Sequence, residues 1–333
     1  QILRESVRSF AENEIKPIAE ELDEKEKFSV ELVRKMAEMG LFGMFVSEEY
    51  GGSNMGYISY IIAVEELARI DGSSAATVAA ANSLGIGPIY YFGNEKQKKE
   101  WLPRLCSGEI LASFGLTEPN AGSDAGATQT TAELKEGEWI INGSKIFITN
   151  SATPISGVIV VQAKTGKRED GRSELSCILV PNDTPGVTAK EMHGKMMWRS
   201  SNTGELYFED VHVPEENLLG KRGEGFKQML STLDRGRLAI AAMGLGGAQG
   251  AFELALKYTK ERIDDGLEWL ADHTYRSVGD SKAAEDLSKS VYELGKARES
   301  YYTGILEEKA DVQRALNKVD KETGGLLELL NIF

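Results

Sequence analysis

Hydrophobic positions recur at steps of three and four residues through most of residues 1–110, which predicts helices. Over residues 1–22 the apolar stripe includes Ile2, Val7 and Phe10, and similar spacing returns at residues 58–70 and 95–105. Gly40 and the pair at 51–52 interrupt the pattern, as glycine does where a helix stops. The first third of the chain therefore predicts a helical segment.

From residue 111 to about 217 the pattern is typical of strands. Two apolar triplets, residues 139–141 and 146–148, flank Asn142 and Gly143, a pair favoured in type I′ hairpin turns. This arrangement predicts a hairpin turn at Asn142. Apolar runs at 158–161, 177–180 and 205–208 predict further strands, and residues 164–173 read as a polar hairpin loop.

Helical spacing resumes at about residue 224, with one or two long helices expected over 226–262 and an amphipathic helical tail over 287–319. A glycine-rich stretch at 244–250 resembles a dinucleotide fingerprint, but Gln249 stands where the third glycine belongs. The stretch also lies inside a helical run, not after a strand. We expect its glycines to permit close helix packing.

Composition narrows the function class. Of 333 residues, 52 are Asp or Glu and 38 are Lys or Arg, a net charge of -14 that argues against nucleic-acid binding. Two cysteines form no disulfide framework, and the three histidines are too scattered for a metal site, so no metal is expected. No apolar run approaches ~20 residues, so we expect no membrane-spanning helix. The pattern at Gln1 is already helical, and a targeting signal before it is left open.

Two segments carry the chemistry. Residues 114–124 read Phe-Gly-Leu-Thr-Glu-Pro-Asn-Ala-Gly-Ser-Asp, a strand end that runs into a loop with small hydroxyls. Residues 145–150 read Lys-Ile-Phe-Ile-Thr-Asn, which places an aromatic ring two residues before a threonine. Backbone N–H groups and hydroxyls beside a flat aromatic surface suit a flavin ring, whose edge needs fixed donors as it takes up charge.

Both segments closely resemble the flavin-binding signatures of acyl-CoA dehydrogenases. The resemblance covers residues 1 to about 262 and implies an α+β multidomain fold: an N-terminal helical domain (1–110), a middle β-barrel-like domain (111–217) and a C-terminal helical bundle (218–333, atypical after 262). It also implies FAD as the cofactor, an acyl-CoA substrate, electron-transfer flavoprotein as partner, and a homo-oligomer, dimer or tetramer. The location implied is the bacterial cytoplasm or the mitochondrial matrix.

The resemblance assigns roles residue by residue. It places the cofactor against the backbone and side chains of a set that we expect to bind FAD: Phe114, Leu116, Thr117, Ser123, Phe147, Ile148, Thr149 and Arg262. Leu116 is expected to offer its N–H, and Thr117 its N–H and hydroxyl, to the pyrimidine end of the ring. Ser123 is also expected near the CoA part of the substrate, together with Asp234 and Arg237. An Asp234–Arg237 ion pair on one helix face is the plainer interpretation of that segment.

The catalytic base is not identified. Oxidation of an acyl-CoA needs a base for the α-proton while the β-hydrogen leaves as hydride. The family's Tyr-Glu-Gly loop and its late Gly-Gly segment have no counterpart after residue 262. Some members place the base on an earlier helix, at the position of Gly236, which has no side chain. Glu118 lies beside the flavin loop but is expected to be architectural. In the tail, Glu293, Glu299, Glu307 and Glu308 are indistinguishable candidates.

The function expected from these residues is FAD-dependent α,β-dehydrogenation of an acyl-CoA thioester to the 2-enoyl-CoA. Two alternatives stay open. One is an enoyl-CoA reductase that runs the reaction in reverse. The other is a non-catalytic flavin- or CoA-binding subunit that lacks the base. The sequence sets neither the length nor the branching of the acyl chain, because the depth of a pocket depends on tertiary packing.

Overall fold

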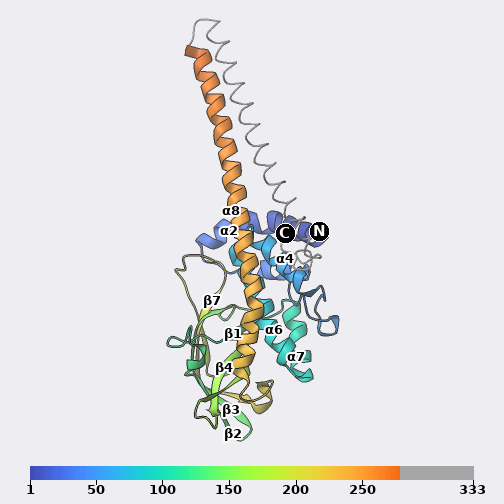
Figure 1. The fold of residues 1–333 in the computed structure, drawn as a ribbon, viewed down its shortest axis with the longest axis vertical. Helices are drawn as coiled ribbons and strands as arrows, with labels where there is room; N and C mark the ends of the chain where they lie inside the picture. Colours follow the sequence, from blue (N-terminus) through green and yellow to red (C-terminus); the bar gives the residue numbers. More distant parts are fainter. Residues whose placement is uncertain (278–333) are drawn as a thin grey trace, which may run out of the picture. The chain divides into compact units, whose positions relative to one another are not determined.

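The computed structural model describes residues 1–277, and residues 1–251 form one compact unit (Figure 1). Its first part is helical, as the periodicity predicts. The helices are α1 (Ile2–Phe10), α2 (Lys16–Glu24), α3 (Val30–Glu38), α4 (Gly56–Ala68), α5 (Gly72–Ala80), α6 (Gly87–Phe92) and α7 (Glu95–Cys106). Short π-helical turns, η1 (Ala11–Ile15) and η3 (Ala81–Ile86), join α1 to α2 and α5 to α6, and η2 (Glu48–Tyr50) is a 3-10 turn.

Side-chain caps explain where two of these helices begin. The Asp71 carboxylate accepts hydrogen bonds from the N–H groups of Ser73 (3.1 Å) and Ser74 (2.8 Å), so α5 starts at Gly72. Asn94 and Gln97 form a reciprocal capping box at the start of α7, with bonds of 2.9 and 3.0 Å. Both caps satisfy N–H groups that the first turn of a helix leaves without a partner.

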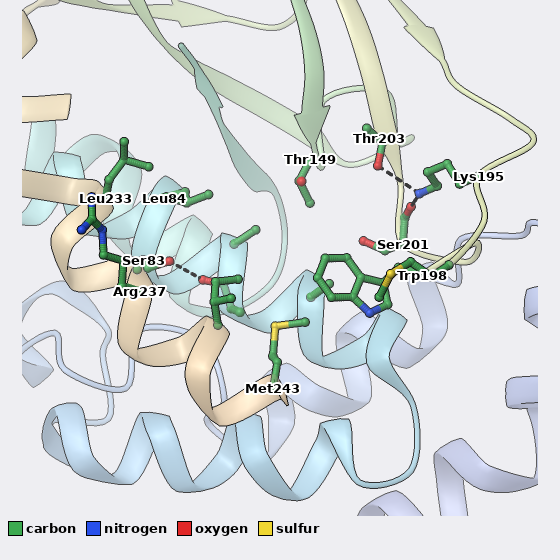
Figure 2. Close-up of a pocket in the computed structure, with 16 residues that line it drawn as sticks. Ser83, Leu84, Thr149, Lys195, Trp198, Ser201, Thr203, Leu233, Arg237 and Met243 are labelled. Atoms are coloured by element: carbon green, nitrogen blue, oxygen red, sulfur yellow. Dashed lines mark hydrogen bonds between the residues drawn. The ribbon is translucent and has the colours of Figure 1, made fainter. Parts of the chain in front are cut away.

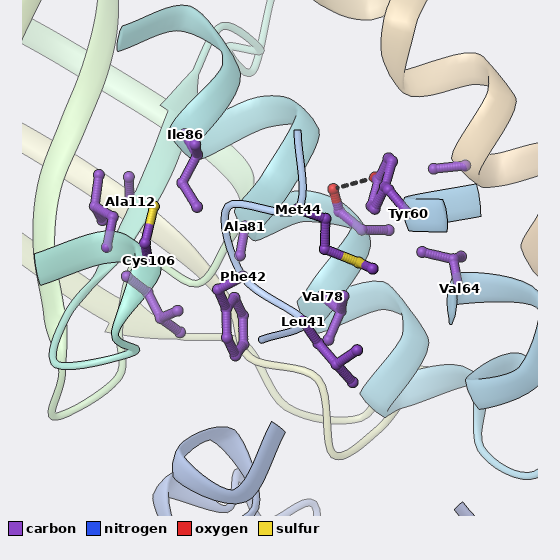
Figure 3. Close-up of a cluster of buried hydrophobic side chains, with 14 of the residues drawn as sticks. Leu41, Phe42, Met44, Tyr60, Val64, Val78, Ala81, Ile86, Cys106 and Ala112 are labelled. Carbon is purple, nitrogen blue, oxygen red and sulfur yellow. Dashed lines mark hydrogen bonds between the residues drawn. The ribbon is translucent and has the colours of Figure 1, made fainter. Parts of the chain in front are cut away.

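The core of the helical part packs around α5 and the segment before α4 (Figure 3). Phe42, Met44 and Tyr60 are buried, and the Tyr60 hydroxyl donates to the Ala79 carbonyl at 2.9 Å. The buried Asn82 side chain joins the two segments: its oxygen accepts from the Gly43 N–H at 2.9 Å and its amide donates to the Leu41 carbonyl at 2.8 Å. A loop buried in this way needs such partners for its backbone.

The middle part is a sheet of eight strands. They are β1 (Leu111–Gly115), β2 (Thr131–Lys135), β3 (Glu138–Thr149), β4 (Ser156–Lys167), β5 (Ser173–Pro181), β6 (Val187–Glu191), β7 (Thr203–Pro214) and β8 (Leu218–Leu219). The order is β6-β7-β3-β2-β4-β5-β8, and β1 pairs with β4 in parallel. The strands expected at 158–161, 177–180 and 205–208 are confirmed within β4, β5 and β7.

The predicted hairpin turn at Asn142 is wrong. Strand β3 runs straight through Asn142 and Gly143, with a bulge opposite β7 between Ile141 and Gly143. The Asn142 amide donates to the Asp210 carboxylate at 3.0 Å, and Gly143 lies so close to Thr130 that a Cβ would be 2.5 Å from the Thr130 hydroxyl oxygen. The glycine is therefore needed for close approach. The β2–β3 turn lies instead at residues 136–137, both with positive φ.

Helix α8 (Gly225–Ser277) confirms the long helix expected after residue 224. Its first part crosses the compact unit. A Cβ on Gly225 would touch Ser176 of β5, one on Gly236 would touch Ser83 of η3, and one on Gly246 would lie 2.1 Å from the Glu65 carbonyl of α4. The glycine-rich stretch therefore serves close helix packing, as expected. A second unit begins at Phe252, and the tail expected over 287–319 lies outside the described residues.

One property of α8 bears on the expectation that the chain has no membrane-spanning helix. By length and composition, residues 225–262 are apolar enough to cross a membrane, although no spanning segment was expected. A core helix meets the same criterion. Ala239, Ala242 and Met243 of this helix belong to the main buried cluster of the helical part, whereas Leu238 and Leu245 are exposed.

We predict that Gly246→Ala destabilises the protein, because its Cβ would lie 2.1 Å from a backbone oxygen of α4. Overpacking of this kind costs about 1–3 kcal/mol of unfolding free energy. Gly247→Ala is the matched control, since its Cβ would meet nothing within 4 Å and alanine favours the helix. Chemical denaturation of both variants measures the difference. Equal stability of the two variants would show that α8 does not pack closely on α4.

Candidate functional site

A cavity of about 490 Å³ lies where α8, the α5–η3 segment and the ends of β3 and β7 meet (Figure 2). Its lining is mostly apolar, with a few hydroxyls and two cationic side chains. The residues are Ala76, Ala79, Ala80, Ser83, Leu84, Thr149, Lys195, Met197, Trp198, Ser201, Thr203, Leu233, Gly236, Arg237, Ile240 and Met243. This combination is typical of a pocket that binds a largely apolar ligand with one charged end.

Helical periodicity creates two walls of this cavity. On α8 the lining residues Leu233, Gly236, Ile240 and Met243 follow one another at three or four positions, so they share one face. The α5–η3 segment contributes residues 76, 79–80 and 83–84 in the same way, mostly alanines. Small side chains on one wall and a glycine on the other leave the space between the helices open.

Trp198 forms another wall of the cavity. Its indole nitrogen sits 2.6 Å from where a Cβ on Gly72 would be, so the ring packs directly on the start of α5. Trp198 has a φ of 52°, a conformation that bulky residues rarely adopt. In Figure 2 Trp198 and Met243 lie at one end of the cavity, and Arg237 and Leu233 lie at the other. The two cations of the lining are thus separated: Lys195 lies near Trp198, and Arg237 lies at the opposite end.

A second cavity of about 160 Å³ adjoins the first, because both are lined by Ala80, Leu84, Thr149 and Leu233. The remaining lining residues come from β1, the loop that follows it, and the end of β3: Ala112, Phe114, Leu116, Thr117, Phe147 and Ile148. The structure therefore brings together six residues expected to bind the flavin, namely Phe114, Leu116, Thr117, Phe147, Ile148 and Thr149.

The donors of this second cavity fit a flavin edge. Within residues 1–277 neither the Thr117 nor the Thr149 hydroxyl has a hydrogen-bond partner, and the Thr117 N–H has none either. The Leu116 N–H, by contrast, donates to the Phe114 carbonyl at 3.1 Å. Of the two residues of this loop that line the cavity, Leu116 and Thr117, it is Thr117 that keeps both donors for a ligand. Hydroxyl and N–H donors that line a cavity without protein partners are what a polar ring edge requires.

A bulge in β3 exposes the aromatic ring of Phe147. The pairing of β3 with β7 shifts register between Lys145 and Ile148, and Phe147 has a φ of 61°. Its side chain is 61% exposed, while Lys145 and Ile148 beside it are buried. The left-handed backbone conformation is unfavourable for an aromatic residue, and the exposed ring makes too few contacts within the protein to offset that cost. The exposed ring borders the cavity and offers a flat surface to a ligand.

The charges around the larger cavity are positive. Lys195 donates hydrogen bonds to the Ser201 carbonyl and, at 3.0 Å, to the Thr203 hydroxyl, and burial lowers the pKa of Lys195. Arg237 is the other cation, and no Asp or Glu occurs among the described residues that line either cavity. These cavities therefore suit an anionic ligand end, but the described lining contains no carboxylate base.

Three expected site residues lie elsewhere. Ser123 is exposed and lines neither cavity. Asp234 forms the i, i+3 ion pair with Arg237, at 3.7 Å between Oδ1 and Nε, with both side chains largely exposed. Arg262 is an exposed residue of the unit that begins at Phe252. Glu293, Glu299, Glu307 and Glu308 lie outside the described residues.

Residues 195–203 were not expected at the site. The larger cavity is lined from the loop before β7 and the first residue of that strand by Lys195, Met197, Trp198, Ser201 and Thr203. One signal was present: residues 196–198 form an apolar triplet inside an otherwise polar loop, and Met196 is 98% exposed. An exposed apolar triplet of this kind indicates a surface that contacts a ligand or partner.

The comparisons with known proteins agree along most of the chain. Residues 1–109 match the model for the acyl-CoA dehydrogenase N-terminal domain, residues 113–211 match the middle domain, and residues 223–279 match the C-terminal domain. The match to the C-terminal domain thus extends past residue 262.

Similar curated proteins include a probable acyl-CoA dehydrogenase of Bacillus subtilis, 50% identical over 79% of this chain and 68% of its own length. A short-chain specific acyl-CoA dehydrogenase of Clostridium acetobutylicum is 45% identical over 81% of this chain and 73% of its own length. An acryloyl-CoA reductase (NADH) of Anaerotignum propionicum is 38% identical over 89% and 77%.

Solved structures show the same likeness. Butyryl-CoA dehydrogenase from Megasphaera elsdenii superposes with a TM-score of 0.74 at 36% identity, over 90% of this chain and 76% of that chain. An acyl-CoA dehydrogenase complexed with FAD from Bacillus anthracis has a TM-score of 0.71 at 37% identity, over 77% of this chain and 43% of that chain.

We predict that Thr149→Val weakens FAD binding, because the Thr149 hydroxyl lies where the two cavities join and has no hydrogen-bond partner among the described residues. Loss of one hydrogen bond costs about 0.5–1.5 kcal/mol of binding free energy. Titration of the apoprotein with FAD, followed by flavin fluorescence, measures it. Lys167→Ala, an exposed change on β4, is the control. Unchanged affinity in Thr149→Val would remove this hydroxyl from the cofactor site.

Proposed function

Because the chain belongs to the acyl-CoA dehydrogenase family, we propose that it oxidises an acyl-CoA thioester at its α and β carbons to the 2-enoyl-CoA. It is a flavin oxidoreductase, and FAD is its cofactor. One observation carries the proposal for the reaction. A cavity with flavin-type donors and a larger apolar cavity with a cationic end meet at Thr149, so a ring and an acyl chain can lie in contact.

The residues of the smaller cavity would hold the flavin ring. The N–H and hydroxyl of Thr117 would bond its polar edge, Thr149 would bond near its centre, and Phe147 would pack on its face. These residues would hold a flavin, which would supply the hydride acceptor for the β-hydrogen of the substrate. Phe114 and Leu116 are buried and close the cavity behind the ring.

The larger cavity would take the acyl chain. Apolar side chains such as Trp198 and Met243 would exclude water from the chain, whereas Arg237 lies at the opposite end, where the CoA portion would enter. A guanidinium suits phosphate recognition because its fork matches two oxygens at once. In a protein with a net charge of -14, such local cations are needed to hold an anionic ester.

Proton abstraction is the step for which the described residues that line the two cavities offer no carboxylate. Gly236 lines the larger cavity, next to Ser83 and Leu84, at the position where some family members carry the base. A Cβ there would lie 3.5 Å from the Ser83 hydroxyl and 3.6 Å from a Leu84 methyl, both ordinary contacts. The site therefore has room for a side chain that this sequence does not supply.

Two other functions compete with the proposed one. A relative of this chain bears the name acryloyl-CoA reductase, which favours the reverse direction as an alternative. The absence of a carboxylate from the described lining favours a non-catalytic binding subunit. Turnover of an acyl-CoA with an artificial electron acceptor separates an enzyme from a binding protein. The flavin potential and the dependence on an electron donor separate the two directions.

Partners and assembly follow from the same proposal. We expect electrons to pass to an electron-transfer flavoprotein, and we expect a homo-oligomer, dimer or tetramer, in the cytoplasm of a bacterium or the mitochondrial matrix. Exposed apolar residues of α8, such as Leu238 (56%) and Leu245 (53%), support a covering partner subunit. Analytical ultracentrifugation of the full chain tests the assembly.

We predict that Arg237→Ala weakens binding of CoA esters by about 1–3 kcal/mol, the range for losing a charge-assisted hydrogen bond. Calorimetry with a saturated acyl-CoA measures the change, and a free fatty acid should bind far more weakly to both proteins. Arg34→Ala, an exposed arginine of α3, is the matched control. If Arg237→Ala binds the ester as tightly as Arg34→Ala does, the CoA portion lies elsewhere.

We predict that Gly236→Glu accelerates α-proton exchange from a CoA ester in D₂O by about 10²–10⁴-fold, the effect of a positioned general base. The Cβ meets only ordinary contacts, so the fold should tolerate the change. Gly236→Gln has the same shape and no basic group, and should leave the rate unchanged. Rapid exchange in the wild type, with no gain in Gly236→Glu, would show that a base already acts on the substrate.

A further inference from the structure

Lys145 is a fully buried lysine directly behind the smaller cavity, and the proposed reaction does not use it. Its side chain is 0% exposed. The ammonium has three hydrogens and three acceptors: the Gln162 carbonyl at 2.7 Å, the Glu118 carboxylate at 2.8 Å and the Leu116 carbonyl at 3.2 Å. All donors of the group are thus used inside the protein, as burial of a charge requires.

Glu118 completes the arrangement from the other side. Its carboxylate is 3% exposed and accepts the N–H groups of Gln129 at 2.6 Å and Thr130 at 3.0 Å. Lys145 and Glu118 therefore connect three segments: the loop after β1, the residues before β2, and strand β4. Burial acts against the ionised carboxylate, but the Lys145 ammonium and these donors hold the pKa of Glu118 below its usual value.

The contact with Leu116 sets the direction of the next peptide donor. In a trans peptide the carbonyl of one residue and the N–H of the following residue point to opposite sides of the same plane. Lys145 holds the Leu116 carbonyl, so the Thr117 N–H points away from Lys145. The following residue, Ile146, donates its N–H to the Thr117 carbonyl at 2.9 Å and fixes the second plane. Thr117 is thereby held on both sides by consecutive residues of β3.

The bulge of β3 turns the side chains of Lys145 and Phe147 in opposite directions. Between Lys145 and Ile148 the register shifts, which turns Lys145 into the interior and leaves Phe147 exposed at the cavity. The same irregular segment of β3 therefore places the Phe147 ring at the cavity and the Lys145 ammonium against the loop after β1, where the N–H and hydroxyl of Thr117 are available to a ligand. Bulges commonly redirect side chains next to functional sites.

We propose that Lys145 is a positioning residue for the flavin: it orients the Leu116–Thr117 peptide so that the Thr117 N–H faces the ring, and it polarises that donor. The inference rests on FAD as the cofactor in the proposed function. An ammonium on the carbonyl oxygen draws electron density through the peptide and strengthens its N–H as a donor. The effect is largest when the ring is reduced and carries more negative charge. Lys145 therefore favours reduced over oxidised flavin.

The test uses the double variant Lys145→Met/Glu118→Gln, which removes both charges and avoids a buried unpaired carboxylate. We expect its preference for reduced over oxidised FAD to fall by about tenfold, which is a midpoint potential about 30 mV lower for a two-electron couple. Spectroelectrochemistry of the FAD-loaded protein measures the potential, and FAD titration of the apoprotein measures the affinity. Lys190→Met, an exposed lysine change on β6, is the control.

The wild type supplies a second measurement that does not depend on a variant that folds. Burial lowers the pKa of Lys145 to about 8, against the attraction of Glu118. Cys177 is the other titratable group that acts on Lys145, and burial raises the pKa of its thiol to about 12, so it stays neutral. Between about pH 7 and pH 9 Lys145 should lose its proton. FAD affinity of the wild type should fall over that range, and that of the double variant should not.

The possible outcomes separate the two proposals. The role of Lys145 would be overturned if the double variant had the same flavin potential and FAD affinity as the wild type, and if FAD affinity changed with pH in the same way in both proteins. The proposed function would then remain intact. A wild-type protein that takes up no FAD would overturn both. A double variant that does not fold leaves the decision to the wild type, where FAD affinity independent of pH across this range would overturn the proposal.

Discussion

An ammonium group in the interior of a protein needs a hydrogen-bond acceptor for each of its hydrogens. In the middle part of this chain, the loop after β1 and strand β4 supply these acceptors to Lys145. Lys145 reaches one carboxylate and one backbone carbonyl of the loop after β1, and one backbone carbonyl of β4. Removal of one partner from a buried ion pair costs about 3–5 kcal/mol, because the other charge is left unpaired. The positions of the β1–β2 loop and of β3 are therefore coupled, and the donors of the smaller cavity depend on that coupling.

Close packing of α8 provides the other half of the site. Gly246 brings the helix against carbonyl groups of α4, and Gly236 faces Ser83 without filling the space between them. Glycine thus acts in two ways on one helix: at residue 246 it lets the backbones touch, and at residue 236 it leaves a cavity. Helix α8 packs closely on α4 at Gly246. Near Gly236, small residues on α8 and on the α5–η3 segment leave the space that forms the larger cavity.

The two halves differ in what they supply to the proposed reaction. The β side presents hydroxyls, an N–H group and an aromatic ring, all suited to a flavin. The helical side presents apolar surface and Arg237, suited to an acyl chain with an anionic carrier. Among the described residues neither side presents a carboxylate to the cavities, although Glu118 lies close to the loop. Its hydrogen bonds to Lys145, Gln129 and Thr130 leave it an architectural role, as expected from the sequence.

The sequence alone determined the order of helical and strand regions, the helix over 95–105 and the use of glycine for packing in α8, because periodicity and capping are short-range properties. It also predicted Phe114, Thr117 and Thr149 as flavin contacts from two contiguous motifs, and these residues line one cavity. Only the tertiary structure decided the rest. The Asn142–Gly143 pair became a bulge because β7 and Thr130 lie against it, a contact no local pattern encodes. Lys145 contacts the loop after β1 from strand β3, and residues 195–203 line the larger cavity from between β6 and β7 and from the start of β7. Their roles therefore depend on packing that spacing cannot reveal.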